Sequence, residues 1–564
     1  MKNQAPTGER STVEHRPTWF NPMPPLRQDC VLREMLDQRA KLYPDRRLAL
    51  FENGNSWTYQ ECRTAVRNLA AALQNLGVRK GNRVLAWLPS DQNMVLSWFA
   101  ANYIGAIFVP LNTAYRGQVL QHVINSAGGE VLLAHHSLME RLAELDLPNL
   151  KNVISVGRSE ISTSKIKQNK PCKSTPFQIL DEAALIGSGT ELDDSVSIDH
   201  WDIQTIIYTS GTTGPSKGVL SPYLQLYTTA VVNYGYMGEG EAILVNLPMF
   251  HVGGTSPIYC ALVRSGSFYL VDGFSTQKFW AQVRTGNCTT TSGLIGVMAA
   301  FLGKAEPHPN DANNSLRYIT MFPVNADTVA MAKRFNFNYL TGFNMTEVAT
   351  PLMTDLNTTV YGSCGKARSG IECRLVDVHD IQVPQGSPGE LIVRSDTPWS
   401  MNAGYDNMPE ATATVWRNGW FHTGDIFRQD EDGNYFFVDR IKDTIRRRGE
   451  NISSFEVENA VRQFPDVDEA IAVGVDSEIS EQEIMLVVTA KTGCIIDPQV
   501  LIEFLIPRLA YFMVPRFVRI VTDIPKTETN KPRKVFFRDL GLTSDTWDRE
   551  RAGLKLKREK LLEL

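Results

Sequence analysis

The stretch Ile206-Ile207-Tyr208-Thr209-Ser210-Gly211-Thr212-Thr213-Gly214-Pro215-Ser216-Lys217-Gly218-Val219 is the most informative part of the 564-residue sequence. An apolar strand runs into a loop of glycines and small hydroxyl residues that carries one lysine. Glycines let backbone N–H groups approach an anion, the hydroxyls add donors, and Lys217 adds a positive charge. The loop is therefore predicted to hold a phosphate. It is not a Walker A loop, because Lys217 stands between Ser216 and Gly218. A Gly/Ser loop without a ligand stays open as the alternative.

Short apolar runs alternate with amphipathic helical patterns on the N-terminal side of this stretch. Strands are predicted over residues 46–51, 83–89 and 107–110. A helix is predicted between the first two strands, because Thr58 and Glu61 have the spacing of a capping box and Gly77 ends the apolar periodicity. This succession of strand, helix and strand predicts a mostly parallel α/β architecture.

The pattern changes towards the C-terminus. Residues 159–175 are polar and aperiodic and are interpreted as a surface loop. After Gly362, shorter strands and tighter turns indicate an antiparallel or barrel-like part, and residues 547–564 suggest a charged helical tail. We expect an α/β fold in which an N-terminal extension (1–30) precedes a large domain with mixed or parallel sheets and a distorted β-barrel (31–439). A small α+β domain follows (440–564).

Composition excludes several classes of protein. With 57 Lys plus Arg against 62 Asp plus Glu, nothing attracts the chain to nucleic acid. The 43% of hydrophobic residues excludes extended disorder. Eight scattered cysteines without a C-x-x-C pair argue against a zinc site or a disulfide framework. Residues 96–110, the most apolar run, are too short to span a membrane, and the N-terminus does not resemble a signal peptide. A cytoplasmic protein without a transmembrane segment is expected.

Six motifs together resemble the adenylate-forming superfamily of acyl-CoA synthetases, aryl-CoA ligases, luciferases and peptide-synthetase adenylation domains. The stretch Tyr208–Val219 resembles its signature. Five further motifs follow in the order of the family, so that the resemblance covers roughly residues 30 to 540: Asn246–His251, Gly342–Glu347, Gly419–Asp425, Asp439–Ser453 and Pro525–Lys531.

The resemblance implies an ATP site with Mg²⁺. Its phosphate ligands would be Thr209, Ser210, Gly211, Thr212, Thr213, Gly214 and Lys217, with Thr346 on the α-phosphate. Glu347 would anchor Mg²⁺ with Thr209 nearby, since magnesium prefers hard oxygen ligands. Phe343 would stack on adenine, Asp425 would accept hydrogen bonds from both ribose hydroxyls, and Arg440 would reach the ribose or a phosphate. Without the family motif, Glu347 would be read as a surface acid, Asp425 as a turn residue and Phe343 as core packing.

Two further motifs imply a catalytic lysine and a moving domain. Lys531 would bridge the substrate carboxylate and the α-phosphate, although a solvated basic run is the default interpretation of residues 526–534. Asn530 stands where relatives usually have glycine. By resemblance, Lys442 would be the hinge, and Gly449, Glu450 and Asn451 would form the hairpin that faces the site during thioester formation.

The acyl pocket is predicted to include His251, Met321 and Phe322, the last two standing where many relatives have glycines or small residues. This pair and the hairpin resemble the crotonobetaine/carnitine–CoA ligase branch, which implies a short- to medium-chain or small polar acid.

Only thirty residues follow Lys534, which leaves no room for a fused carrier domain, so free coenzyme A is the expected acceptor. A separate carrier protein, a luciferase-like route and a degenerate nucleotide-binding homologue are the alternatives. A homodimer is possible.

Overall fold

The computed structural model describes residues 24–157, 177–182, 186, 191–209, 216–295, 297–440, 444–448, 450–476, 481–525, 532, 534–554 and 556. Within these ranges, every helix is too short or too polar to cross a membrane. Five predicted features fall outside them: most of the N-terminal extension, the polar loop over 159–175, the phosphate-loop residues Ser210–Gly214, the hinge residue Lys442, and the residues Gly449 and Lys531.

A seven-stranded sheet in the order β7-β6-β5-β3-β4-β8-β9 carries the predicted phosphate loop. Its strands are parallel except for the last, β9, which is antiparallel to β8. In chain order they are β3 (Arg83–Trp87), β4 (Ile107–Pro110), β5 (Val131–His135), β6 (Asn152–Val156), β7 (Gln178–Asp181), β8 (Ile203–Thr209) and β9 (Lys217–Pro222). Helix α5 (Gly117–Ala127) and the 3₁₀ helix η1 (His136–Leu142) pack against it. The phosphate loop therefore links the ends of two paired strands.

A second sheet, β12-β10-β11-β1-β2, is parallel except for β2. It comprises β1 (Arg47–Phe51), β2 (Ser56–Thr58), β10 (Ala242–Val245), β11 (Ser267–Leu270) and β12 (Cys288–Thr291), with α9 (Phe279–Gly286) packed on it. One hydrophobic core joins both sheets through α2 (Leu32–Leu42), α3 (Tyr59–Asn75), α4 (Gln92–Tyr103), α7 (Tyr223–Asn233) and α8 (Val252–Val263). Helix α4 packs on the first sheet and α8 on the second. The predicted capping box of Thr58 and Glu61 is present at the start of α3.

Between the second sheet and the next subdomain lies a small parallel sheet. It consists of β13 (Leu294–Ile295), β14 (Tyr318–Phe322) and β15 (Asn338–Leu340), with helices α10 (Val297–Gly303) and α11 (Ala326–Phe335). A three-stranded antiparallel sheet follows, made of β16 (Gly342–Phe343), β17 (Leu352–Met353) and β18 (Lys366–Ala367).

The part predicted to be antiparallel or barrel-like is an antiparallel sheet. Its strands are β19 (Ile371–Val376), β20 (Gly389–Ser395), β21 (Trp416–Arg417), β22 (Trp420–Gln429) and β23 (Tyr435–Arg440), with the short helix α12 (Pro409–Val415) beside β22. Strand β22 carries the predicted ribose turn, and β23 leads towards the predicted hinge.

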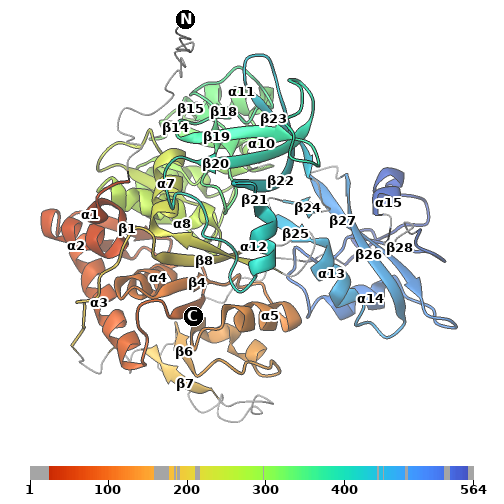
Figure 1. The fold of residues 1–564 in the computed structure, drawn as a ribbon, viewed down its shortest axis with the longest axis horizontal. Coiled ribbons are helices and arrows are strands. Elements are labelled where there is room, and N and C mark those ends of the chain that lie inside the picture. Colours follow the sequence, from red (N-terminus) through yellow and green to blue (C-terminus); the bar gives the residue numbers. More distant parts are fainter. Residues whose placement is uncertain are drawn as a thin grey trace, which may run out of the picture.

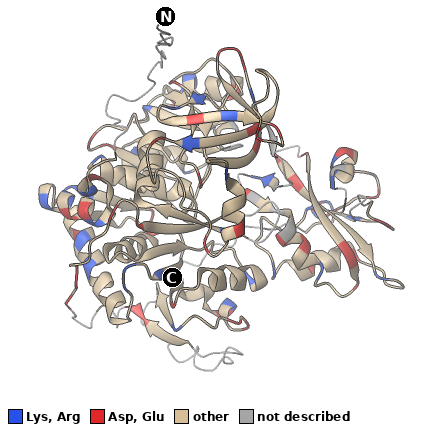
Figure 2. Cartoon of the chain, in the orientation of Figure 1, with Lys and Arg blue, Asp and Glu red and all other residues tan. Residues whose placement is uncertain are grey.

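The C-terminal part, blue in Figure 1, has cores of its own. It contains the hairpin β24 (Thr444–Arg447) and β25 (Glu450–Ser453) and the sheet β26 (Val467–Asp476), β27 (Gln482–Ala490), β28 (Phe517–Ile520) and β29 (Trp547–Asp548). Helices α13 (Ser454–Val461), α14 (Pro498–Leu505) and α15 (Lys534–Leu540) complete it. Figure 2 shows that acidic and basic residues are interspersed along both parts of the chain. The exact boundary at residue 440 stays a prediction.

The prediction of a helical tail from Trp547 is wrong at its start. Trp547 and Asp548 form β29, antiparallel to β28, and residues 549–553 form turns. The guanidinium of Arg516 donates to both carboxylate oxygens of Asp548, at 3.2 and 3.1 Å, and Trp547 packs against the C-terminal core. These tertiary contacts outweigh the helical propensity of a charged segment.

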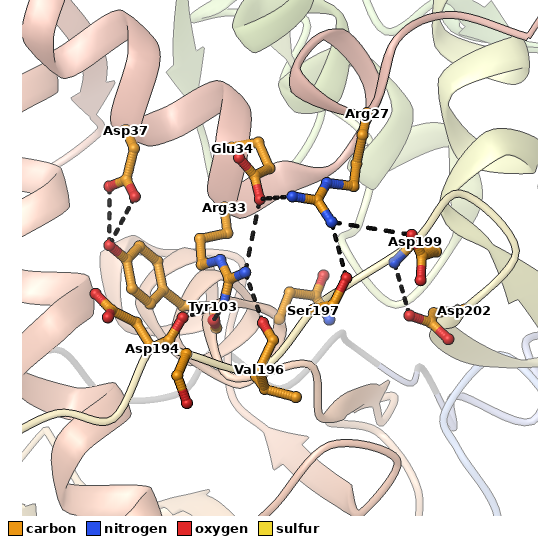
Figure 3. A network of polar contacts seen from close by, with 12 residues as sticks. Arg27, Arg33, Glu34, Asp37, Tyr103, Asp194, Val196, Ser197, Asp199 and Asp202 are labelled. Atoms are coloured by element: carbon orange, nitrogen blue, oxygen red, sulfur yellow. Dashed lines mark hydrogen bonds and ion pairs between the residues drawn. The ribbon is translucent and has the colours of Figure 1, made fainter.

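A polar network anchors the segment that enters β8 (Figure 3). The guanidinium of Arg33, from α2, donates to the carbonyl oxygens of Val196 at 2.8 Å and Asp194 at 3.2 Å. Arg27, from the short helix α1 (Arg27–Cys30), donates to the hydroxyl of Ser197 at 2.8 Å. The path into the phosphate-loop strand is therefore fixed by helices from the start of the chain.

Candidate active site

The two ends of the phosphate loop lie opposite each other. Thr209 and Lys217 are register partners in the β8–β9 pair, and the Thr209 hydroxyl lies 3.4 Å from the Lys217 carbonyl oxygen. The side-chain ammonium of Lys217 lies 4.8 Å from the centre of the Tyr405 ring, within the range of a cation–π contact. The loop thus begins and ends at the two residues whose hydroxyl and ammonium groups the sequence assigned to phosphate binding.

Glu347 is buried, its neighbour Thr346 is partly exposed, and both are held by residues from distant parts of the chain. The amide of Gln225, on α7, donates to the Thr346 carbonyl oxygen at 2.7 Å. The hydroxyl of Tyr405 donates to Glu347 Oε1 at 3.0 Å, and the backbone and side-chain amides of Asn402 both donate to the Glu347 carbonyl oxygen. With 6% exposure, Glu347 is not an ordinary surface acid. Desolvation and the Glu347 carboxylate together raise the pKa of Tyr405, so its hydroxyl stays a donor at neutral pH.

The donor set near Glu347 fits a cation that takes most of its ligands elsewhere. Among the described residues, no three His, Cys, Asp or Glu side chains gather as a metal site. Glu347 and the Thr209 hydroxyl offer hard oxygen atoms, which suit Mg²⁺ that keeps waters and binds nucleotide phosphates. These residues therefore fit a magnesium ion that is bound together with a nucleotide.

The predicted ribose turn is supported from behind by Glu390. One carboxylate oxygen of Glu390 accepts the backbone N–H of Gly424 at 3.0 Å, and the other lies 3.0 Å from Nδ1 of His422. The Thr423 hydroxyl donates to the Leu391 carbonyl oxygen and accepts the backbone N–H of Asp425. Asp425, at 3% exposure, is therefore a buried carboxylate on a doubly braced turn.

The two neighbours predicted for the nucleotide lie near this turn. Phe343 meets Phe427 edge-on, with ring centres 4.9 Å apart, so this ring also belongs to a hydrophobic cluster. Arg440 is the register partner of Asp425 in the β22–β23 pair. The side chain of Arg440 is outside the described part of the structure.

The predicted acyl and thioester residues come together across the two parts of the chain. Nε2 of His251, which precedes α8, lies 3.2 Å from Oε2 of Glu450 at the start of β25. Asn451 follows in the same strand, and its side chain is not among those described. Met321 is fully buried in a hydrophobic cluster and pairs with Leu294, whereas its neighbour Phe322 is partly exposed. The structure thus brings His251 to Glu450 and leaves Phe322, rather than Met321, accessible.

A second contact between the two parts involves residues that the sequence did not suggest. Glu456, on α13, accepts the backbone N–H of Ser216 at 3.1 Å and also the Ser216 hydroxyl. Burial raises the pKa of Glu456. The pKa of Tyr115 is raised mainly by desolvation, and the carboxylates of Glu456 and Glu450 raise it further. Glu456 and Tyr405 both act on the phosphate-loop end from far along the chain, so no local sequence signal pointed to them.

Comparison with known proteins identifies the family. A family model described as AMP-binding enzyme matches residues 36–405, and one described as AMP-binding enzyme C-terminal domain matches residues 456–531. The chain belongs to the AMP-binding enzyme family. It is therefore an enzyme of the adenylate-forming class, an AMP-forming acid–thiol ligase.

Relatives of this AMP-binding enzyme carry names of CoA ligases. It is 27% identical over 524 residues to the crotonobetaine/carnitine–CoA ligase of Salmonella paratyphi A, covering 89% of this chain and 97% of the relative. The o-succinylbenzoate-CoA synthetase of Bacillus subtilis, solved as a double mutant with a product analogue, superimposes with a TM-score of 0.76 at 22% identity, covering 91% and 99% of the two chains. The same synthetase with AMP gives 0.61 at 23% identity, covering 90% and 98%.

Proposed function

We propose that the chain is an ATP-dependent acyl-CoA ligase. It adenylates a carboxylic acid with release of pyrophosphate and then transfers the acyl group to free coenzyme A with release of AMP. The observation that carries the proposal is a set of direct contacts: Tyr405 touches both Lys217 and Glu347, His251 lies beside the hairpin residue Glu450, and Ser216 donates to Glu456 of the C-terminal part. The CoA ligase names of the curated relatives support the choice of acceptor.

Residues of the N-terminal domain serve the first half-reaction. The acid carboxylate and the α-phosphate of ATP repel each other, so the site must hold them together and neutralise charge on the phosphate oxygens. Lys217 supplies a positive charge at the loop end, Thr346 lies beside the α-phosphate, and Asp425 accepts hydrogen bonds from the ribose hydroxyls. Magnesium, held through Glu347 and Thr209, adds charge neutralisation when it is bound with the nucleotide. Lys531, in the C-terminal domain, stabilises the transition state by its charge.

The arrangement of the two parts in this structure belongs to the second half-reaction. Glu450, on the hairpin predicted to face the site during thioester formation, contacts His251. The better superposition on a relative solved with its CoA product analogue than on the same relative with AMP supports this assignment. Rotation about Lys442 would exchange this arrangement for the one that presents Lys531.

The acid is proposed to be short- to medium-chain or small and polar, such as a carnitine-like acid. Two observations support it: the names of the curated relatives, and the bulk of Phe322, the partly exposed last residue of β14. The pocket would then accept a small head group better than a long alkyl chain.

Pyrophosphate exchange into ATP with a panel of acids tests the proposal. Exchange with small acids, followed by AMP release only when coenzyme A is added, is the expected result. A preference for palmitate would overturn the proposed acid. Transfer to a carrier protein but not to coenzyme A would overturn the acceptor. Absence of exchange with every acid would favour a nucleotide-binding protein without ligase activity.

A further inference from the structure

The segment from Asn402 to Asp406 is attached to the strand that leaves the phosphate loop. The backbone N–H of Ala403 donates to the Leu220 carbonyl oxygen at 2.9 Å, and the N–H of Leu220 donates back to Gly404 at 3.0 Å. The N–H of Asp406 donates to the Gly218 carbonyl oxygen at 2.8 Å. Since β9 begins at Lys217, these hydrogen bonds fix the position of the segment relative to the end of the phosphate loop.

Tyr405 lies in the middle of this segment and is held on all sides. Its side chain is 8% exposed, and its backbone N–H donates to the Thr412 hydroxyl at 2.9 Å. The preceding residue, Gly404, has a φ of +114°, and a Cβ there would lie 2.8 Å from the Thr412 methyl group. Only glycine permits that backbone and that close approach, so the direction of the Tyr405 ring is set by the fold.

The two ends of the Tyr405 side chain contact two groups that act on the nucleotide. Its hydroxyl donates to Glu347 Oε1 at 3.0 Å, and the Lys217 ammonium lies 4.8 Å from the ring centre. Asn402, in the same segment, donates twice to the Glu347 carbonyl oxygen, at 3.0 and 2.9 Å. One short segment therefore binds both the backbone and the carboxylate of Glu347, and its Tyr405 ring lies against the ammonium of Lys217.

We propose that Tyr405 is a positioning residue for nucleotide binding, which sets the separation between the Glu347 carboxylate and the Lys217 ammonium. A metal–triphosphate complex has to meet both charges at once. A hydroxyl that donates to Glu347 limits the orientations of the carboxylate, and a ring beneath Lys217 favours one position of the ammonium. The inference rests on the proposed function only in taking a metal-bound ATP as the ligand.

Direct binding of Mn²⁺ as a magnesium substitute, followed by electron paramagnetic resonance with α,β-methylene-ATP, tests the proposal. Tyr405→Phe keeps the ring and removes the hydroxyl. We expect the Mn²⁺ affinity of the ternary complex to fall on the order of tenfold, the scale of one lost hydrogen bond to a charged group. Binding of AMP, which lacks the β- and γ-phosphates, should be unchanged. Tyr405→Leu, which also removes the ring, should additionally weaken binding of the triphosphate analogue without metal.

Tyr435→Phe is the matched control. Tyr435 is also buried, and its hydroxyl lies 3.4 Å from the Cys373 carbonyl oxygen, away from Glu347. Removing that hydroxyl should leave Mn²⁺ affinity unchanged.

Three outcomes would contradict the proposal. Equal Mn²⁺ affinity in wild type and Tyr405→Phe, or an equal loss in Tyr435→Phe, would show that Tyr405 only packs. A wild-type protein that binds no metal–nucleotide complex would contradict the proposed function, and this inference with it.

Discussion

At the scale of the residue, the buried carboxylate of Asp425 makes a prediction about ribose recognition. Its turn is braced by Glu390 and Thr423, so replacing it with asparagine should keep the backbone. Asp425→Asn offers one acceptor oxygen instead of two and no charge, and should weaken ATP binding about tenfold or more. Isothermal titration with 2′,3′-dideoxy-ATP provides the control, because wild type and variant should bind it alike. A variant that loses both nucleotides equally would return Asp425 to the role of a turn residue.

A second residue-scale prediction concerns pH. Desolvation and the adjacent His136 lower the pKa of His135 from 6.5 to about 4. Between pH 6.5 and 4, this side chain is therefore protonated in the unfolded chain and neutral in the folded chain. The free energy of unfolding consequently falls as the pH drops from 6.5 towards 4. His135→Gln should remove on the order of 1–2 kcal/mol of this loss between pH 7.5 and 5, read from urea unfolding.

The exposed His379 offers the control for the pH experiment. His379→Gln should leave the pH dependence of unfolding as in wild type. If His135→Gln also leaves it as in wild type, the buried ring does not sense pH in this window.

At the scale of the element, α15 is tied to α13 by the lysine that begins it. The ammonium of Lys534 donates to the Ser454 hydroxyl and forms an ion pair with Glu458, both at 2.6 Å. Lys534 is therefore not part of a solvated basic surface, and its contacts fix the start of α15. Glu458 is buried at 4% exposure, so Lys534→Met would leave a buried carboxylate with fewer partners.

Lys534→Met should therefore loosen α13 and α15 by about 1–3 kcal/mol of local opening free energy. Hydrogen exchange of peptides from these helices measures this directly. The double variant Lys534→Met/Glu458→Met should recover part of the loss, because it removes the buried carboxylate together with its lysine, although Arg462 and the backbone N–H of Ala472 then lose their partner as well. Faster exchange of equal size in both variants would mean that packing, not the ion pair, holds α15.

At the scale of the whole molecule, loss of the contact between Glu456 and Ser216 should affect one half-reaction and not the other. The carboxylate takes a backbone N–H and a hydroxyl of the phosphate loop. Glu456→Gln weakens both hydrogen bonds and should slow thioester formation from pre-made acyl-adenylate and coenzyme A by about tenfold. Pyrophosphate exchange, which uses the other arrangement, should stay near wild type. Equal slowing of both steps would argue against a role for Glu456 in one arrangement only.

The catalytic and hinge lysines make the complementary prediction. Lys531→Ala should lower adenylate formation by about 10²–10³ and leave thioester formation from pre-made adenylate near normal. Lys442→Pro should impair thioester formation more than adenylation, because proline fixes the backbone dihedral that the rotation has to change. Rapid-quench measurements of each half-reaction decide the matter. If both variants slow both steps equally, the alternation of domains is contradicted and Lys531 belongs to a basic surface.

Local chemistry was sufficient for much of the fold. Apolar periodicity predicted the strands that become β1, β3 and β4, and the Thr58–Glu61 spacing predicted the cap of α3, since both depend on neighbours within one turn or one strand. Six ordered motifs indicated the family that the comparison confirmed, whereas phosphate binding by the loop after Thr209 stays a prediction.

Tertiary structure alone decided how these pieces meet. Tyr405 lies 58 residues from Glu347, and Glu456 lies 240 residues from Ser216, so neither contact leaves a pattern in the intervening sequence. Burial of Met321 and the pairing of Trp547 with β28 also depend on which surfaces the finished core presents. Periodicity indicates which face of its own helix or strand a residue occupies. Contact with a residue from a distant element forms only after the intervening chain has folded and the two elements pack together.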